Sequence, residues 1–166
     1  DEASITRLEE FKNWINSLEE SDLAQREDIK ISASSTRGND NVSFGPQHMI
    51  DGNYDTYFAT DDSVKTVSIE IDLGATQDIE GVILQEYISL GQRVSSYVIE
   101  CYVGKQWVEV ASQSTIGYKK LIMGKTKETN GNEFPKTKYF SLQTNLFCPY
   151  KKATSFLFFS LPLQQK

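Results

Sequence analysis

The stretch FGPQHMIDGNYDTYF, residues 44–58, decides the fold, because it joins two strand-like segments through one short loop rich in oxygen-bearing and aromatic side chains. Gly52 allows the backbone conformation that a tight loop needs. Side-chain oxygens, the ligands that calcium prefers, recur at Asp51, Asn53, Asp55 and Thr56. Such residues also form Asx turns that cap local backbone amides, and both interpretations stay open. The loop is typical of a clip in a β-sandwich and favours a binding domain over an enzyme.

Apolar and polar residues alternate with a period of two after residue 28, which indicates half-buried strands of an antiparallel sheet. Gly104-Lys105 supplies a two-residue hairpin turn. The pattern predicts strands over residues 29–33, 67–73, 79–85, 97–103, 107–111 and 115–122, with less regular candidates at 138–143 and 154–161. Many short strands joined by regular turns predict a sandwich or a barrel.

A different period occurs at the start of the chain, where residues 4–20 predict an amphipathic helix. Its apolar face consists of Ile5, Leu8, Phe11, Trp14, Ile15 and Leu18, which recur at steps of three and four. Ser4 is a candidate N-cap. We expect the large aromatic side chains of this helix to be buried against another surface, either of this domain or of a neighbouring domain outside the sequence.

The bulk properties describe one globular domain of 166 residues with a formal net charge of −6, which argues against a nucleic-acid partner. Residues 1–118 hold 8 Lys+Arg against 21 Asp+Glu, a net of −13, whereas residues 119–166 hold 9 Lys against 2 Glu, a net of +7. We therefore divide the chain into a linker helix (1–27), a sandwich (28–122) and a tail (123–166). We expect the tail either to supply the last strands of the sandwich or to be sequence that does not belong to the native protein. The chain lacks a signal peptide, and we expect a fragment of something longer.

Residues 29–122 resemble the discoidin domain, also called the coagulation factor V/VIII type C domain. The resemblance rests on segments 31–35, 49–58, 69–74, 81–84 and 107–111, which include the Asp-Gly loop and a strand that begins at Trp107. It implies an all-β fold, the galactose-binding-like β-sandwich jelly roll. The same superfamily includes the carbohydrate-binding modules of family 32. The amphipathic helix precedes this sandwich.

A narrower resemblance, over segments 6–11, 84–94 and 115–120, is to the C-terminal domain of α-L-fucosidases of glycoside hydrolase family 29. It implies a non-catalytic accessory domain that binds a fucose- or galactose-containing glycan or braces the catalytic barrel of a parent enzyme. It also implies a secreted or periplasmic location. The alternatives are a structural domain without sugar affinity and an adhesion-type module. The polar, acidic loops make a membrane partner unlikely.

Candidate site residues follow from the same resemblance and from the polar loops. The carbohydrate-binding candidates are Arg37, Asn39, His48, Tyr87 and Arg93, and the candidate calcium ligands of a structural site are Asp51, Asn53 and Thr56. Each of these residues also has a plainer structural interpretation, as part of a solvated loop, as a partner in a local hydrogen bond, or as an aromatic residue that packs in or at the rim of the core. For Glu86 and Arg93 the plainer interpretation is a mutual ion pair that pins the loop 87–91.

The sequence contains no recognisable set of catalytic residues. It has no Gly-x-Ser-x-Gly motif, no phosphate-binding glycine loop and a single histidine. Cys101 lies on the apolar face of a predicted strand, which favours a buried free thiol. The sequence leaves a bridge between Cys101 and Cys148 undecided.

Overall fold

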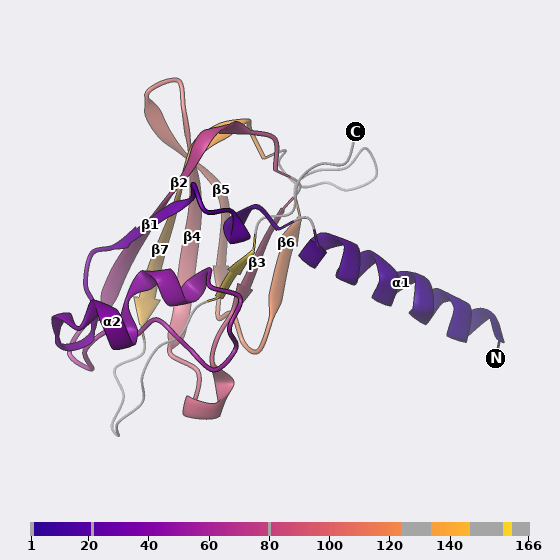
Figure 1. Cartoon of the computed structure of the whole chain (residues 1–166), viewed down its shortest axis with the longest axis horizontal. Helices are drawn as coiled ribbons and strands as arrows, with labels where there is room; N and C mark the ends of the chain where they lie inside the picture. Colours follow the sequence, from indigo (N-terminus) through magenta and orange to yellow (C-terminus); the bar gives the residue numbers. More distant parts are fainter. Residues whose placement is uncertain (1, 21, 80, 124–133, 147–157, 161–166) are drawn as a thin grey trace.

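The computed structural model describes residues 2–20, 22–79, 81–123, 134–146 and 158–160. The helical elements are α1 (Glu2–Glu20), η1 (Leu23–Gln25), η2 (Arg37–Asn39), α2 (Asn41–Phe44), η3 (Pro46–Met49) and η4 (Ile88–Leu90). The strands are β1 (Lys30–Ala33), β2 (Thr66–Gln77), β3 (Gly81–Gln85), β4 (Val94–Val103), β5 (Gln106–Ser114), β6 (Lys120–Met123), β7 (Thr137–Leu146) and β8 (Phe158–Ser160). The all-β class with an N-terminal helix is confirmed (Figure 1).

The strands form two antiparallel sheets that enclose the core. One sheet has five strands in the order β1-β2-β7-β4-β5, and the other has three in the order β6-β3-β8. On β2 the apolar side chains of Val67, Ile69, Ile71 and Leu73 point inward and are at most 2% exposed. Burial of each such side chain contributes about 1.5–3 kcal/mol, so the two-residue alternation fixes which face of the strand turns inward.

The strand predicted over residues 138–143 is present as β7, which lies between β2 and β4 in the five-stranded sheet. Phe140 and Leu142 on this strand are buried in the core. The neighbouring Lys138 forms an ion pair with Asp72 of β2, with a separation of 3.6 Å between Nζ and Oδ1. The basic later part of the chain thus lies directly beside the acidic earlier part.

The hairpin turn predicted at Gly104-Lys105 is present between β4 and β5. Its residues have φ values of 57° and 72°, the pair of left-handed conformations that a two-residue type I′ turn needs. The strand predicted over 115–122 is wrong in its first half, because β6 begins at Lys120. Thr115 and Gly117 have φ values of 25° and 77°, which extended strands do not adopt. The strand predicted over 154–161 is described only at β8.

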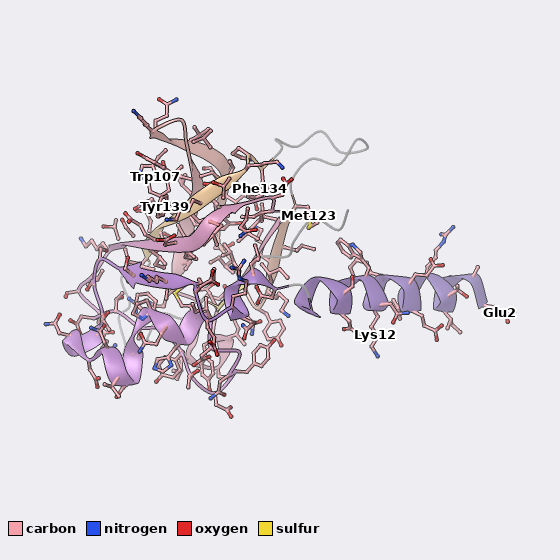
Figure 2. The ribbon with its side chains drawn as sticks, turned by 45° about the horizontal axis from the view of Figure 1, so that its top comes forward. Glu2, Lys12, Trp107, Met123, Phe134 and Tyr139 are labelled. Atoms are coloured by element: carbon pink, nitrogen blue, oxygen red, sulfur yellow. The ribbon has the colours of Figure 1, made fainter. Side chains whose placement is uncertain are left out.

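Helix α1 extends away from the sandwich (Figure 1). The side chains of Ile5, Leu8 and Phe11 are 59%, 72% and 59% exposed, and the Phe11 ring packs on Trp14 at 5.7 Å between centroids. The sandwich therefore leaves the described apolar face of α1 largely open to solvent (Figure 2).

Candidate binding site at the loop end of the sandwich

One end of the sandwich, here called the loop end, gathers three irregular segments, residues 34–65, 86–93 and 115–119. Antiparallel pairing explains this, because the end of β1 lies beside the start of β2, and the start of β4 lies beside the ends of β5 and β7. The end of β3 likewise lies beside the start of β6. All five predicted carbohydrate-binding residues are on the first two of these segments.

Arg37 and Arg93 converge on one carboxylate. The Nη1 atom of Arg37 lies 3.1 Å from Oδ1 of Asp62, and Nη1 of Arg93 lies 3.6 Å from the same oxygen. The Arg93 side chain is 1% exposed, whereas those of Arg37 and Asp62 are 28% and 39% exposed. Arg37 also donates to the carbonyl oxygen of Thr60 at 3.3 Å. The loop end thus holds a partly exposed carboxylate between one buried guanidinium group, that of Arg93, and one partly exposed guanidinium group, that of Arg37.

Glu86 fixes the segment that carries Arg93. Its carboxylate accepts the backbone N–H groups of Arg93 and Val94 on Oε1, at 2.7 and 2.9 Å, and that of Gly117 on Oε2, at 3.1 Å. Its own N–H donates to the Gly117 carbonyl. The carboxylate therefore joins the segments 86–93 and 115–119 through backbone groups. Glu86 thus holds the loop 87–91 through the backbone of Arg93, whose guanidinium lies beside Asp62. The ion pair between the side chains of Glu86 and Arg93 stays a prediction.

Aromatic rings connect the remaining segments of the loop end. The ring of Tyr57 lies 5.7 Å from that of Phe44 and 5.2 Å from that of Tyr87, measured between centroids. Tyr57 and Tyr87 are half-buried and present part of their rings to solvent, whereas Phe58 is fully buried in the core. Tyr87 thus lies in contact with the loop 50–60 as well as being close in sequence to Arg93.

His48 and Asp51 form a second, separate cluster. Nδ1 of His48 lies 3.0 Å from Oδ2 of Asp51, and Nε2 lies 2.9 Å from the carbonyl oxygen of Val42. Partial burial acts to lower the pKa of His48, but these two hydrogen bonds outweigh it and hold the pKa above the usual 6.5. Burial acts to raise the pKa of Asp51, yet the hydrogen bonds from Thr56 and His48 outweigh it and leave the pKa below 3.8.

The three candidate calcium ligands are already joined by local hydrogen bonds. Asp51 accepts from the backbone of Asn53 at 2.9 Å and from the hydroxyl of Thr56 at 2.6 Å, while Oδ1 of Asn53 accepts from the backbone of Asp55. Among the described residues no group of three or more His, Cys, Asp or Glu side chains is placed to hold a metal. These hydrogen bonds are those of an Asx-turn loop. Calcium binding stays a prediction.

The structure therefore brings only some of the predicted residues together. Arg37 and Arg93 share Asp62, and Tyr87 lies on the same segment as Arg93, where its ring contacts that of Tyr57. His48 belongs to the separate cluster with Asp51, and Asn39 is an exposed residue with a φ of 56°. Asp62 was not among the site residues predicted from the sequence. The sequence signal for this carboxylate was the pair Asp61-Asp62 directly after the aromatic loop. Both residues contact the segment 37–39, since Asp61 accepts the backbone N–H of Gly38 and Asp62 contacts Arg37.

Cys101 takes no part in this site. It is a free cysteine that is fully buried on β4, and burial raises its pKa to about 12. The thiol is therefore protonated and unreactive at neutral pH, as expected of a small core residue. Cys148 lies outside the described residues.

The comparisons with known proteins agree with this architecture. The sequence profile of the F5/8 type C domain matches residues 30–146, more than half of the chain. The chain therefore belongs to the F5/8 type C domain family, the discoidin β-sandwiches. Such a domain is a non-catalytic module. No helix in the described part of the chain is long and apolar enough to cross a membrane.

The relatives narrow the assignment. Alpha-L-fucosidase 1 of Arabidopsis thaliana is 28% identical over 123 residues, which cover 73% of this chain and 24% of that protein. A GH29 fucosidase of Ruminococcus gnavus, solved in complex with fucose, matches with a TM-score of 0.80 and 28% identity over 100% of this chain and 31% of that one. The chain thus spans a quarter to a third of these relatives and matches an accessory portion of larger enzymes.

A smaller relative shares the fold alone. The family 32 carbohydrate-binding module of Clostridium perfringens NanJ, solved in complex with galactose, matches with a TM-score of 0.65 and 16% identity. The match covers 85% of this chain and 97% of that module. A complete small module therefore has the same architecture as the sandwich described above.

Proposed function

We propose that this chain is the non-catalytic accessory domain of an α-L-fucosidase and that its loop end binds a fucose- or galactose-containing glycan. One observation carries the proposal, namely that Arg37 and Arg93 converge on Asp62 at the loop end, where Tyr87 on the segment 86–93 is also partly exposed. The fucosidase relatives and the galactose-bound module with the same fold support it. A secreted or periplasmic location follows from such a partner.

The chemistry of the cluster suits a sugar with neighbouring hydroxyl groups. The partly exposed Arg37 guanidinium donates hydrogen bonds to hydroxyl oxygens, and the Asp62 carboxylate, held between Arg37 and the buried Arg93, accepts from hydroxyl hydrogens. The Tyr87 ring offers an apolar surface to the C–H face of a pyranose. Because Glu86 fixes the segment that carries Arg93, little conformational freedom is lost when the ligand binds.

A second role is favoured by the exposed face of α1. We infer that Ile5, Leu8 and Phe11 dock onto the remainder of the longer polypeptide, since the matched fucosidases extend well beyond the region that this chain covers. Docking would remove these side chains from water and so brace the catalytic domain. This role does not require any sugar affinity.

A glycan array probed with the chain, followed by calorimetry, tests the first role. We expect fucosylated or galactosylated ligands to bind, and Arg37→Ala and Tyr87→Ala each to weaken binding by about tenfold. Phe11→Ala, an exposed aromatic residue on α1, is the matched control and should bind as the wild-type chain does. A flat array with folded protein would contradict the sugar-binding role and leave bracing as the function.

A further inference from the structure

A row of aromatic side chains crosses the outer face of the five-stranded sheet at the end opposite the loop end. Strand register places Trp107 of β5 opposite Tyr102 of β4, and the pairing of Cys101 with Phe140 brings Tyr139 of β7 beside Tyr102. The centroid of the Tyr102 ring lies 5.2 Å from that of Trp107 and 5.9 Å from that of Tyr139. These three residues are called the aromatic row.

The aromatic row is accessible and held in place. Trp107 is 38% exposed and Tyr102 and Tyr139 are half-buried, so each presents part of its ring to solvent. Both ring contacts are edge-to-face, with interplanar angles of 63° and 79°. Lys138 adds a cation–π contact, with Nζ at 4.9 Å from the Tyr139 centroid. Figure 2 shows Trp107 and Tyr139 together at the end of the sheet that lies far from α2.

A row of carboxylates borders the aromatic row, two residues away on the same face. Register aligns Glu109, Glu100, Ser141 and Glu70 across β5, β4, β7 and β2. Two residues along a strand correspond to about 7 Å, so the rows lie side by side. Glu100 stands directly opposite Glu109, a like-charge pairing that destabilises a sheet. Glu70, Glu100 and Glu109 are called the carboxylate row.

The rest of this face carries mostly polar side chains. Ser68 and Gln143 are joined by a side-chain hydrogen bond, and Gln143 also donates to the hydroxyl of Ser141 at 2.8 Å. Protein interfaces are depleted in Ser and Glu, which dominate here, although they are enriched in Tyr and Trp. Exposed rings beside hydroxyl, amide and carboxylate groups instead match a ligand that has an apolar C–H face and many hydroxyl groups at its edge.

We propose that the aromatic row and the carboxylate row form a second carbohydrate-binding surface, which takes an uncharged, β-linked oligosaccharide of the glucose or N-acetylglucosamine type. In such sugars the ring hydroxyls are equatorial, so that axial C–H bonds form an apolar face that stacks on Trp107. The carboxylates accept hydrogen bonds from the hydroxyl groups at the edge of the sugar. Their negative charge disfavours uronates and sialylated glycans.

This surface is independent of the loop end. The Gly104-Lys105 turn, next to Trp107 and Tyr102, closes the opposite end of β4 from Val94, which adjoins the loop end. A ligand here therefore needs none of the contacts of Arg37, Asp62 or Arg93. Sugars whose ring hydroxyl groups are all equatorial also differ from fucose and galactose, which each carry an axial ring hydroxyl. The two surfaces can therefore be distinguished by the ligand that binds as well as by the variant that abolishes binding.

Tryptophan fluorescence of the full chain tests the proposal, because the sequence has only two tryptophans, Trp14 and Trp107. A Trp14→Phe background leaves Trp107 as the sole indole fluorophore. We expect cellohexaose or N-acetylchitohexaose at millimolar concentration to shift or quench its emission in a saturable manner. A β-1,4-linked hexaglucuronate, which has the ring geometry of cellohexaose with a carboxylate on each ring, should have no effect until Glu100→Gln and Glu109→Gln remove the opposing charges.

Calorimetry of variants completes the test. Trp107→Ala in the wild-type background should weaken binding of the neutral oligosaccharides by about tenfold or more, because a stacked indole is a large share of the buried area. Tyr87→Ala at the loop end should leave this binding unchanged, with circular dichroism as the check on folding. Failure of both neutral oligosaccharides to bind the folded wild-type chain, or equal loss in Tyr87→Ala, would overturn the second surface without touching the proposed function.

Discussion

At the loop end, the side chains are held by hydrogen bonds between segments far apart in the sequence, whereas the aromatic row on the opposite end is placed by strand register. Glu86 exemplifies the first kind of order, since one carboxylate ties together the backbone of residues 93, 94 and 117. Trp107 exemplifies the second, since its position follows from the partner that faces it on β4. A site built on loops therefore depends on a few buried polar groups, whereas a site on a sheet face depends on the integrity of the sheet.

The largest expected effect comes from breaking the sheet that carries the aromatic row. Phe140→Ala on β7 should lower the free energy of unfolding by about 3–5 kcal/mol, because it leaves a cavity where a fully buried ring had been. Its neighbour Tyr139 points to the outer face, so Tyr139→Ala should lower the value by about 1 kcal/mol. Urea unfolding monitored by circular dichroism measures both. Equal losses would mean that β7 does not turn its Phe140 face inward.

The next effect concerns the polar network of the loop end. Glu86→Ala removes a buried acceptor of three backbone N–H groups and should lower the free energy of unfolding by about 3 kcal/mol. Glu100→Ala on the outer sheet face is the matched control and should change it by less than about 0.5 kcal/mol, since it relieves repulsion with Glu109. If the two glutamates proved equivalent in urea unfolding, the contrast between the two ends would fail.

A smaller, pH-dependent effect is expected at the cluster of His48 and Asp51. The folded pKa of His48 is raised, so its stabilisation is fully present below pH 6.5 and is lost as the pH rises through the folded pKa. The folded pKa of Asp51 is lowered, so its stabilisation is present above pH 3.8 and is lost as the pH falls through the folded pKa.

Thermal melts across pH 4 to 8 measure the His48 part of this dependence on the wild-type chain and on His48→Gln. The sequence has a single histidine, so its substitution should remove most of the dependence above pH 6. An unchanged pH profile in His48→Gln would show that the contact with Asp51 does not stabilise the fold.

The smallest effect is expected for calcium at the loop end. Because Asp51, Asn53 and Thr56 already satisfy one another and the local backbone, millimolar calcium should leave the melting temperature where EDTA leaves it. A clear rise with calcium, absent in Asp51→Asn, would instead show that the loop rearranges around an ion. That result would confirm a calcium site at residues 51–56.

Much of the sheet could be predicted from the sequence, and much of the loop end could not. The alternation of Val67, Ile69, Ile71 and Leu73 is a local signal, so β2 and its inward face were predictable. The strand expected to begin at Thr115 failed because Gly117 takes a left-handed conformation that lets its N–H reach Glu86. That contact spans 31 residues, and no local pattern encodes it. The convergence of two arginines on Asp62 is hidden for the same reason.

The central claim is that the loop end of this F5/8 type C domain binds a glycan. The most direct measurement is an amide NMR titration of the isotope-labelled chain with a fucosylated and a galactosylated oligosaccharide. The account predicts saturable shifts at residues 37–39, 57–62 and 86–93, with little change along β5. Absence of shifts at the loop end for both ligands, with a folded spectrum, would contradict it.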